Sequence, residues 1–271
     1  MALTVLIRGA GDIASGIALR LWRAGCFRIM MTETAQPTTI RRTVAFSEAV
    51  RLGECRVEEV TARRADSLEE AQRLLSRGFL PVLIDPQNIR RAALRPDAEV
   101  DAILAKRNLG TAITDAPVVV GVGPGFTAGL DCHAVVETMR GHTLGRVYYK
   151  GAALPNTNIP GLIGGFAGER VLRAPADGVF ESTRAIGDLV EAGETVGHVA
   201  GKPMTATISG VLRGLLADGV SVRAGMKSGD VDPRGKAEYC TLVSDKALCV
   251  GGGVLEAILH CHFQNREGQH E

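Results

Sequence analysis

The chain opens with an apolar strand that runs directly into closely spaced glycines. Residues 4–8 (Thr-Val-Leu-Ile-Arg) are followed by the glycine-rich segment 9–16 and then by an amphipathic run over residues 17–24. Gly9 permits a tight turn, Gly11 lets a phosphate approach the backbone, and the N-terminus of the following helix attracts anions. This order predicts a dinucleotide-binding βαβ unit; the alternative is a strand–helix turn without a ligand.

A second strand, from Phe27 to Thr32, is expected to end at Glu33. An acid about 20 residues after such glycines holds a ribose hydroxyl. Arg41 follows, and an arginine here can hold an adenosine 2′-phosphate, or it can be a solvated charge. Because Glu33 would oppose that phosphate, the pattern favours NAD or plain adenosine over NADP.

Further apolar strands alternate with helical segments in the first half of the chain. We expect strands at residues 80–84 and 116–122, with helices at 68–77 and about 96–106. Buried strands joined by helices predict an α/β protein with a Rossmann-like doubly wound parallel sheet, and ligands bind beyond the carboxyl ends of such strands. The predicted cofactor-binding residues at these ends are Gly9, Gly11, Asp12, Ile13, Glu33, Arg41, Asp85, Gly123 and Gly125.

Candidate catalytic side chains gather after the second glycine loop. A helix over residues 132–139 would place His133 and Glu137 on one face, with Asp131 near its N-terminus and His142 beyond its end. Such groups can form an acid/base pair, or they can be a solvated aspartate and a surface His–Glu pair. No third histidine is suitably spaced, so no metal site is expected.

The second half of the chain contains an internal repeat at an offset of 32 residues. Residues 174–179 match 206–211, and residues 187–193 match 219–225. The repeated hairpin units resemble the two halves of a biotinyl/lipoyl-type barrel-sandwich domain, a small all-β fold. Lys202 lies where those domains carry their modified lysine, although the usual flanking methionines are missing; the alternative is an exposed lysine of a structural barrel.

The predicted domains are a Rossmann-like nucleotide-binding domain over residues 1–165 and a barrel-sandwich domain over 166–235. Residues 236–271 are expected to form a strand (239–243) and a helix capped by Ser244-Asp245, and this part can return to the first domain or stand apart from it. Glycines 251–253 imply either a break in that helix or a backbone packed very close to another element.

The composition limits location and partners. The net charge of +1 gives no general attraction to nucleic acid or to a membrane, and no apolar stretch reaches the length of a membrane span. No signal peptide is recognisable at the N-terminus, and the 6 cysteines are scattered without a CxxC pair. Together these features predict a cytoplasmic protein. A homo-oligomer is compatible with these features.

Several short sequence segments together resemble one family, the accessory proteins of the selenium-dependent molybdenum hydroxylase system. They are residues 8–14, 41–49, 123–131, 136–145, 227–234, 244–246 and 251–256. The resemblance implies a protein that helps to mature xanthine dehydrogenase-type hydroxylases, with such a hydroxylase as partner. It also implies binding of a nucleotide or of the phosphate of a molybdopterin-type cofactor, and it implies no established catalytic reaction.

Two other functions are compatible with the same residues. One is an NAD-dependent oxidoreductase, for which Glu33 is present but an evident catalytic motif is not. The other is a non-catalytic module that docks a partner enzyme through its barrel. Whether the chain is an enzyme is therefore left open by its sequence.

Overall fold

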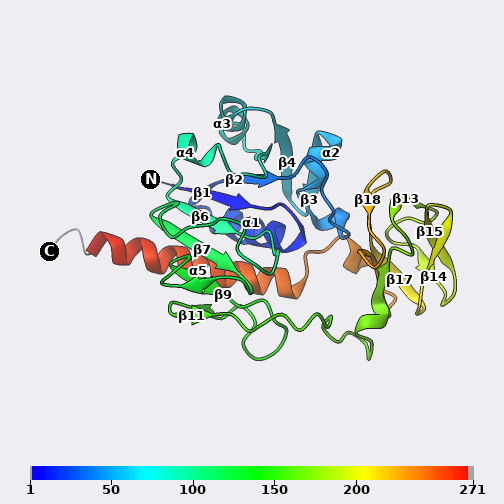
Figure 1. Cartoon of the computed structure of the whole chain (residues 1–271). Coiled ribbons are helices and arrows are strands. Elements are labelled where there is room, and N and C mark those ends of the chain that lie inside the picture. The colour runs from blue at the N-terminus through cyan, green and yellow to red at the C-terminus, as the bar shows by residue number, and fades with distance from the viewer. Residues whose placement is uncertain (1, 268–271) are drawn as a thin grey trace. The chain divides into compact units, whose positions relative to one another are not determined.

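The computed structural model describes residues 2–267, which divide into two compact units. Unit 1 contains the segments up to Ala35, Phe46–Thr157 and Val243 onward. Unit 2 contains Gln36–Ala45 and Asn158–Leu242. Figure 1 shows the elements of both units, with the chain coloured from blue at its start to red at its end.

Unit 1 is built on a nine-stranded sheet of order β10-β9-β7-β6-β1-β2-β5-β4-β3. Its strands, in that order, are Val147–Tyr148, Ala134–Val136, Val118–Val122, Ala98–Asp101, Leu3–Arg8, Phe27–Glu33, Leu80–Ile84, Val60–Ala65 and Glu54–Val57. A further two-stranded sheet pairs β8 (Thr127–Ala128) with β11 (Gly151–Ala152).

The large sheet is mixed, which corrects the predicted doubly wound parallel sheet. The strands from β9 to β4 are parallel, but β10 and β3 pair antiparallel with their neighbours at the two edges. The connections from β6 to β7 and from β7 to β9 are fully described and contain no helix. The α/β class is therefore right, whereas the Rossmann-like architecture is wrong.

The helix predicted over residues 96–106 is instead strand β6 and a following loop. Its acidic residues Glu99 and Asp101 are buried in the sheet. Charged side chains are seldom fully buried unless they are paired, so a strand with two buried acids is not expected from the sequence alone. Pairing with Arg8 of the neighbouring strand β1 explains the difference.

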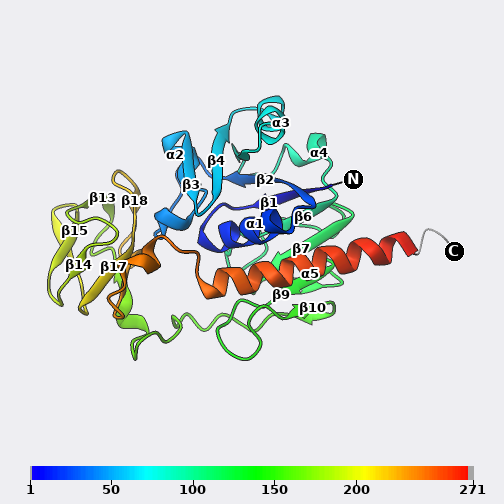
Figure 2. The same cartoon turned by 180° about the vertical axis from the view of Figure 1, so that it is seen from behind.

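Helices flank the large sheet. Figure 2 shows α1 (Asp12–Ala24) and α5 (Asp245–Glu267) together in front of it. The shorter helices of unit 1 are α2 (Glu48–Leu52), α3 (Leu68–Ser76) and α4 (Arg91–Leu94). Apolar side chains of α3 pack with those of β1, β2 and β5 in one core cluster, which includes Leu6, Met30 and Leu74.

Glycines allow α1 and α5 to pack very closely. A Cβ added at Gly16 would lie 2.5 Å from that of Ala247, and one at Gly251 would lie 2.9 Å from the carbonyl oxygen of Gly16. Gly253 meets Gly145 on the other side of α5. The helix is continuous through these glycines, so close packing, rather than a break, accounts for them.

Unit 2 consists of two four-stranded antiparallel sheets, β12-β19-β17-β14 and β16-β15-β13-β18. In chain order its strands are Val171–Arg173, Gly178–Ser182, Leu189–Val190, Thr195–Val199, Lys202–Thr205, Gly210–Leu215, Ser221–Val222 and Lys227–Asp232. The unit also has three 3-10 helices, η1 (Arg42–Val44), η2 (Gly168–Arg170) and η3 (Ala237–Cys240). Strands β13, β14 and β15 begin 32 residues before β17, β18 and β19, as the internal repeat predicts.

These two antiparallel sheets correct the prediction of a biotinyl/lipoyl-like barrel-sandwich. Lys202 is the first residue of strand β16, where it pairs with Val199. The turn before it is formed by Ala200 and Gly201, which both have positive φ. The lysine therefore does not lie at the tip of a turn joining the two repeats.

The end of the chain differs from its prediction in one element. The strand expected at 239–243 is absent, because residues Ala237–Cys240 form the 3-10 helix η3. Ser244 does cap the following helix, since its Oγ accepts the N–H of Ala247 at 3.2 Å. No helix among the described residues has the length and apolar character required to cross a membrane.

Candidate functional site

The loop between β1 and α1 is where the first glycines lie. Helix α1 begins after Gly11, which supplies no side-chain cap. Its φ of −68° and ψ of −176° form an extended backbone that any residue can adopt. By contrast, α3 begins after Ser67, whose hydroxyl accepts the N–H of Glu70 at 3.1 Å. A conventional cap is therefore absent at α1 although the same chain uses one elsewhere.

Glu33 is brought to this loop, as the sequence predicts. Its Oε2 accepts the N–H of Ala10 at 2.9 Å, and its Oε1 accepts the N–H of Thr34 at 2.8 Å. Asp12 Oδ1 accepts the N–H of Ile13 at 2.9 Å. The carboxylates of Glu33 and Asp12 therefore satisfy part of the loop's backbone donors.

Asp85 lies beside Glu33 at the end of strand β5. Its N–H donates to the carbonyl of Glu33, and its carboxylate accepts the N–H groups of Ile89 and Arg90 at 3.0 and 2.8 Å. These bonds close the turn that follows β5. Asp85 thus organises the backbone at the carboxyl edge of the sheet.

The segment 102–107 lies between the two glycine loops. A Cβ at Gly9 would be 3.0 Å from the carbonyl oxygen of Ala102, and one at Gly125 would be 2.6 Å from the Cα of Arg107. Leu104 and Lys106 have φ of 60° and 62°, in the left-handed region that non-glycine residues rarely adopt. Backbone strain of this kind is concentrated at functional sites.

Gly123 has a packing role of its own in the second glycine loop. Its φ is 81°, and an added Cβ would lie 2.8 Å from Oγ1 of Thr138. Gly125 likewise has a φ of 111°. Both glycines are required by the backbone and its neighbours, so neither needs a ligand to explain it.

A buried polar cluster, missed by the sequence reading, lies at the ends of β1 and β6. Arg8 Nη1 is 3.2 Å from Asp101 Oδ2 and also contacts Thr111. Thr111 donates its hydroxyl to Asp101 at 2.6 Å. Glu99 is 3.9 Å from Arg8 Nε, and its other neighbours are Asn88 and Arg91. The one signal in the sequence was the alternation of acidic and apolar residues from 97 to 101.

Glu99 is the most perturbed carboxyl group in this cluster. Its side chain is fully buried, and this desolvation raises its pKa to about 7. The hydrogen bond from Asn88 and the charges of Arg8 and Arg91 oppose that rise, while Asp115 adds to it. An acid that titrates near neutral pH beside specific charged partners is a candidate functional group.

The predicted catalytic residues do not form one cluster. Residues Ala134–Val136 are strand β9, so the helix over 132–139 is wrong and His133 and Glu137 do not share a helical face. Buried Glu137 accepts three backbone N–H groups, from Thr138, Met139 and Leu154, each at 2.8 Å. Its carboxylate therefore holds the surrounding backbone in place.

Each of the other predicted catalytic residues has its own local environment. Asp131 Oδ2 accepts the N–H of Thr127 at 2.8 Å, and His142 is exposed. His133 Nδ1 accepts the N–H of Val119, while burial lowers the pKa of its imidazole. Desolvation raises the pKa of buried Cys132 to about 11, which suppresses its thiolate. Within residues 2–267, no group of His, Cys, Asp and Glu side chains has the arrangement of a metal site.

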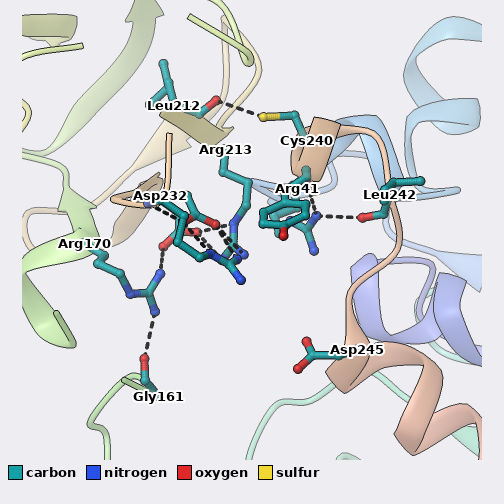
Figure 3. A network of polar contacts seen from close by, with 12 residues as sticks. Arg41, Gly161, Arg170, Leu212, Arg213, Asp232, Cys240, Leu242 and Asp245 are labelled. Atoms are coloured by element: carbon teal, nitrogen blue, oxygen red, sulfur yellow. Dashed lines mark hydrogen bonds and ion pairs between the residues drawn. The ribbon is translucent and has the colours of Figure 1, made fainter. Parts of the chain in front are cut away.

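Arg41, predicted to bind a cofactor phosphate, belongs to unit 2. Its guanidinium donates to the carbonyl oxygens of Tyr239 and Leu242 at 3.0 and 3.1 Å. Figure 3 shows it beside Cys240, whose thiol donates to the carbonyl of Leu212. Arg41 thus joins the segment 36–45 to the end of unit 2.

Buried ion pairs extend this network through the β-sheet of unit 2. Asp230 pairs with Arg170 and Arg213, each at 2.6 Å, and Asp232 pairs with Arg213 at 3.2 Å and Arg234 at 2.6 Å (Figure 3). Burial opposes ionisation of Asp232, but hydrogen bonds from Arg234 and the charges of both arginines outweigh it and lower its pKa.

The network connects the segments at the beginning and the end of unit 2 to its β-sheet. Arg170 also donates to the carbonyl of Gly161 at 3.1 Å, and the guanidinium of Arg234 lies 4.4 Å from the ring centre of Tyr239. Its members come from the segments 36–45, 158–170, 210–215 and 227–242. We therefore assign the ion pairs a structural role within this unit.

A pocket of about 380 Å³ also lies within unit 2. Its lining includes Glu169, Leu172, Arg173, Pro203 and Met204. None of the residues predicted from sequence to bind a ligand contributes to it.

The chain is similar over most of its length to part of a longer protein. It is 54% identical over 255 residues to an uncharacterized protein, YqeB, of Escherichia coli (strain K12). The match covers 94% of this chain but 47% of YqeB, so the chain spans about half the length of this curated relative. No protein-family model matches the chain.

Similarity to solved structures is weak. An aspartoacylase family protein from Mesorhizobium loti is 14% identical, with a TM-score of 0.27 and 85% of each chain covered. A succinylglutamate desuccinylase/aspartoacylase from Rhodobacter sphaeroides is 12% identical, with a TM-score of 0.26 and the same coverage. Similarity at this level assigns neither a fold nor a reaction to the chain.

The predicted family and function are withdrawn, because no comparison supports them. The solved structures are aspartoacylase and desuccinylase proteins, and neither they nor YqeB point to selenium, to a molybdenum hydroxylase or to its maturation. The oxidoreductase and docking alternatives gain no support either. The segment around Gly123 and Gly125 contributed to the resemblance to that accessory-protein family. Local backbone packing explains its two glycines.

Proposed function

We propose that the protein binds a small anionic molecule at the carboxyl edge of the parallel strands, on the loop between β1 and α1. The observation that carries the proposal is the uncapped start of α1 at Gly11. Because the Gly11 backbone is extended, its conformation does not require glycine. A residue without a side chain at this position leaves room for a ligand to approach the N-terminus of the helix.

Positive charge near the loop supports an anionic ligand. Lys106 and Arg107 are exposed and belong to the strained segment that lies against both glycine loops. Glu33 already accepts the N–H of Ala10 and places a negative charge on one side of the loop. A ligand with one anionic group and neutral hydroxyls therefore suits this edge better than one with dense negative charge.

The cofactors expected from the sequence remain predictions. An adenine dinucleotide and a molybdopterin-type cofactor both carry phosphate, and the dinucleotide is readily included in a binding test. The six cysteines are free thiols, which supports the predicted cytoplasmic location.

The test is thermal unfolding of the whole chain with pyrophosphate, AMP, NAD and uncharged adenosine. A ligand that binds only the folded state stabilises it by RT ln(1 + c/Kd), where c is the free ligand concentration, so the unfolding temperature rises with ligand concentration. We expect at least one of the three anionic compounds to raise it progressively with concentration, and adenosine to have no effect. The proposal fails if none of the three does so at millimolar concentration.

A matched pair of variants then locates the site. Gly11→Asp supplies a side-chain cap and a negative charge where the ligand would bind, so stability should be kept while the effect of the anion is lost. Gly252→Asp is the control, because an added Cβ there meets nothing within 4 Å. A ligand effect that is kept equally in both variants would place binding elsewhere.

A further inference from the structure

Three buried polar atoms beneath the carboxyl edge of β6 lack hydrogen bonds. They are Glu99 Oε2, Asn88 Oδ1 and Arg91 Nε, and none has a hydrogen-bond partner within the described part of the chain. Buried polar groups are nearly always hydrogen-bonded, so each such atom requires an explanation. Because all three atoms belong to neighbouring side chains, one explanation can account for all of them.

The contacts between these residues bring their three side chains together. Asn88 Nδ2 donates to Glu99 Oε1 at 2.8 Å, which holds the two side chains against each other. Arg91 Nε lies 3.6 Å from Glu99 Oε2, beyond ordinary hydrogen-bond length. The other end of Arg91 is held by an ion pair with Asp115. The guanidinium is therefore fixed near the carboxylate without bonding to it through Nε.

We propose that Asn88, Arg91 and Glu99 form a binding site for one buried water molecule. The site offers two acceptors, Asn88 Oδ1 and Glu99 Oε2, and one donor, the Nε–H of Arg91. A water molecule has two protons to donate and an oxygen to accept the third bond. A metal cation could not accept from Arg91, and an oxyanion could not donate to the two acceptors.

The proposed water would contact a carboxyl group, Glu99, that is surrounded by other charged groups. Arg8 faces Glu99 from β1, Arg91 from α4 and Asp115 from the loop before β7, while Asp101 lies farther along β6. With Glu99 ionised, these five groups carry a net charge of −1, and with Glu99 protonated they are neutral. A water bonded to Oε2 solvates the carboxyl group at the position from which its proton leaves or enters.

A crystal structure of the whole chain that resolves ordered water tests the site. We expect one water peak within hydrogen-bond distance of all three atoms, and the same peak in Glu99→Gln, whose amide keeps a polar atom at this position. The proposal is overturned if the region is empty of density, or if Arg91 Nε closes directly onto Glu99.

A solution measurement on the same protein avoids dependence on crystals. Magnetisation transfer from water to the Asn88 side-chain amide should occur in the wild-type chain and in Glu99→Gln. It should be lost in Arg91→Leu, which removes the donor from the site. Absence of transfer in the wild-type chain, or undiminished transfer in Arg91→Leu, contradicts the proposed site.

Discussion

Gly16 of α1 faces Ala247 of α5 so closely that a methyl group at residue 16 would lie 2.5 Å from the Ala247 methyl. Real Cβ atoms do not approach at this distance, so one helix would have to move. The contact joins the start of α1, where the proposed ligand site lies, to the helix at the end of the chain.

The consecutive glycines of α5 should respond differently to alanine. Gly252→Ala should stabilise the protein by up to about 1 kcal/mol, because alanine is the better helix former and space is open there. Gly251→Ala should destabilise it by roughly 1–3 kcal/mol, because its Cβ would collide with the backbone of α1. Urea unfolding of both variants measures the difference, and equal effects would contradict the packing.

Stability should fall as the pH rises through neutrality because of Glu99. Its pKa is raised from 4.5 to about 7 in the folded state, so the folded chain holds an extra proton between these values. The destabilisation is absent below pH 4.5 and complete above about 7, and it amounts to about 3 kcal/mol.

Glu99→Gln should remove this pH dependence, since glutamine does not titrate. Unfolding free energies of wild type and variant, measured from pH 4.5 to 8, should diverge in favour of the variant as the pH rises. Glu54→Gln is the control, because Glu54 is half exposed. A constant difference between wild type and Glu99→Gln across this range would show that Glu99 titrates normally.

Local patterns predicted many elements of unit 1. Strand β5 at Leu80–Ile84 has the predicted bounds, since a short apolar run bounded by turn formers is characteristic of a buried parallel strand. Strand β6 could not be found in the same way. Its buried Glu99 and Asp101 are tolerated because Arg8 lies in the adjacent strand, and that pairing depends on the tertiary fold.

The candidate site was predictable only for residues that follow a parallel strand directly, because the carboxyl ends of such strands lie at one edge of the sheet. Glu33 ends the strand next to β1 and therefore reaches the first glycine loop. His133 and Glu137 flank a three-residue strand instead of lying in a helix, which separates the groups that helical spacing would have brought together. Arg41, which was predicted to bind a cofactor, belongs instead to unit 2, and sequence alone did not show that its segment joins that unit.

Thiol reactivity should divide the cysteines into two classes. Cys26 and Cys249 are exposed, so both should react with a thiol reagent in the folded protein. Burial raises the pKa of Cys55 to about 12 and of Cys132 to about 11, which leaves almost no thiolate at neutral pH. Mass spectrometry after brief labelling should therefore find Cys132 modified only upon unfolding; rapid labelling of Cys132 in the folded protein would contradict this.

Asp230 should be among the most sensitive positions in unit 2. It is buried and pairs with both Arg170 and Arg213, so Asp230→Asn leaves two guanidinium groups without their shared counter-charge. Removing one partner of a buried ion pair costs on the order of 3 kcal/mol, whereas an exposed pair contributes about 1 kcal/mol or less. Asp66→Asn, at the exposed pair with Arg64, is the matched control. Chemical unfolding should show the larger loss for Asp230→Asn, and if the two variants lose the same small amount, the buried network does not hold unit 2 together.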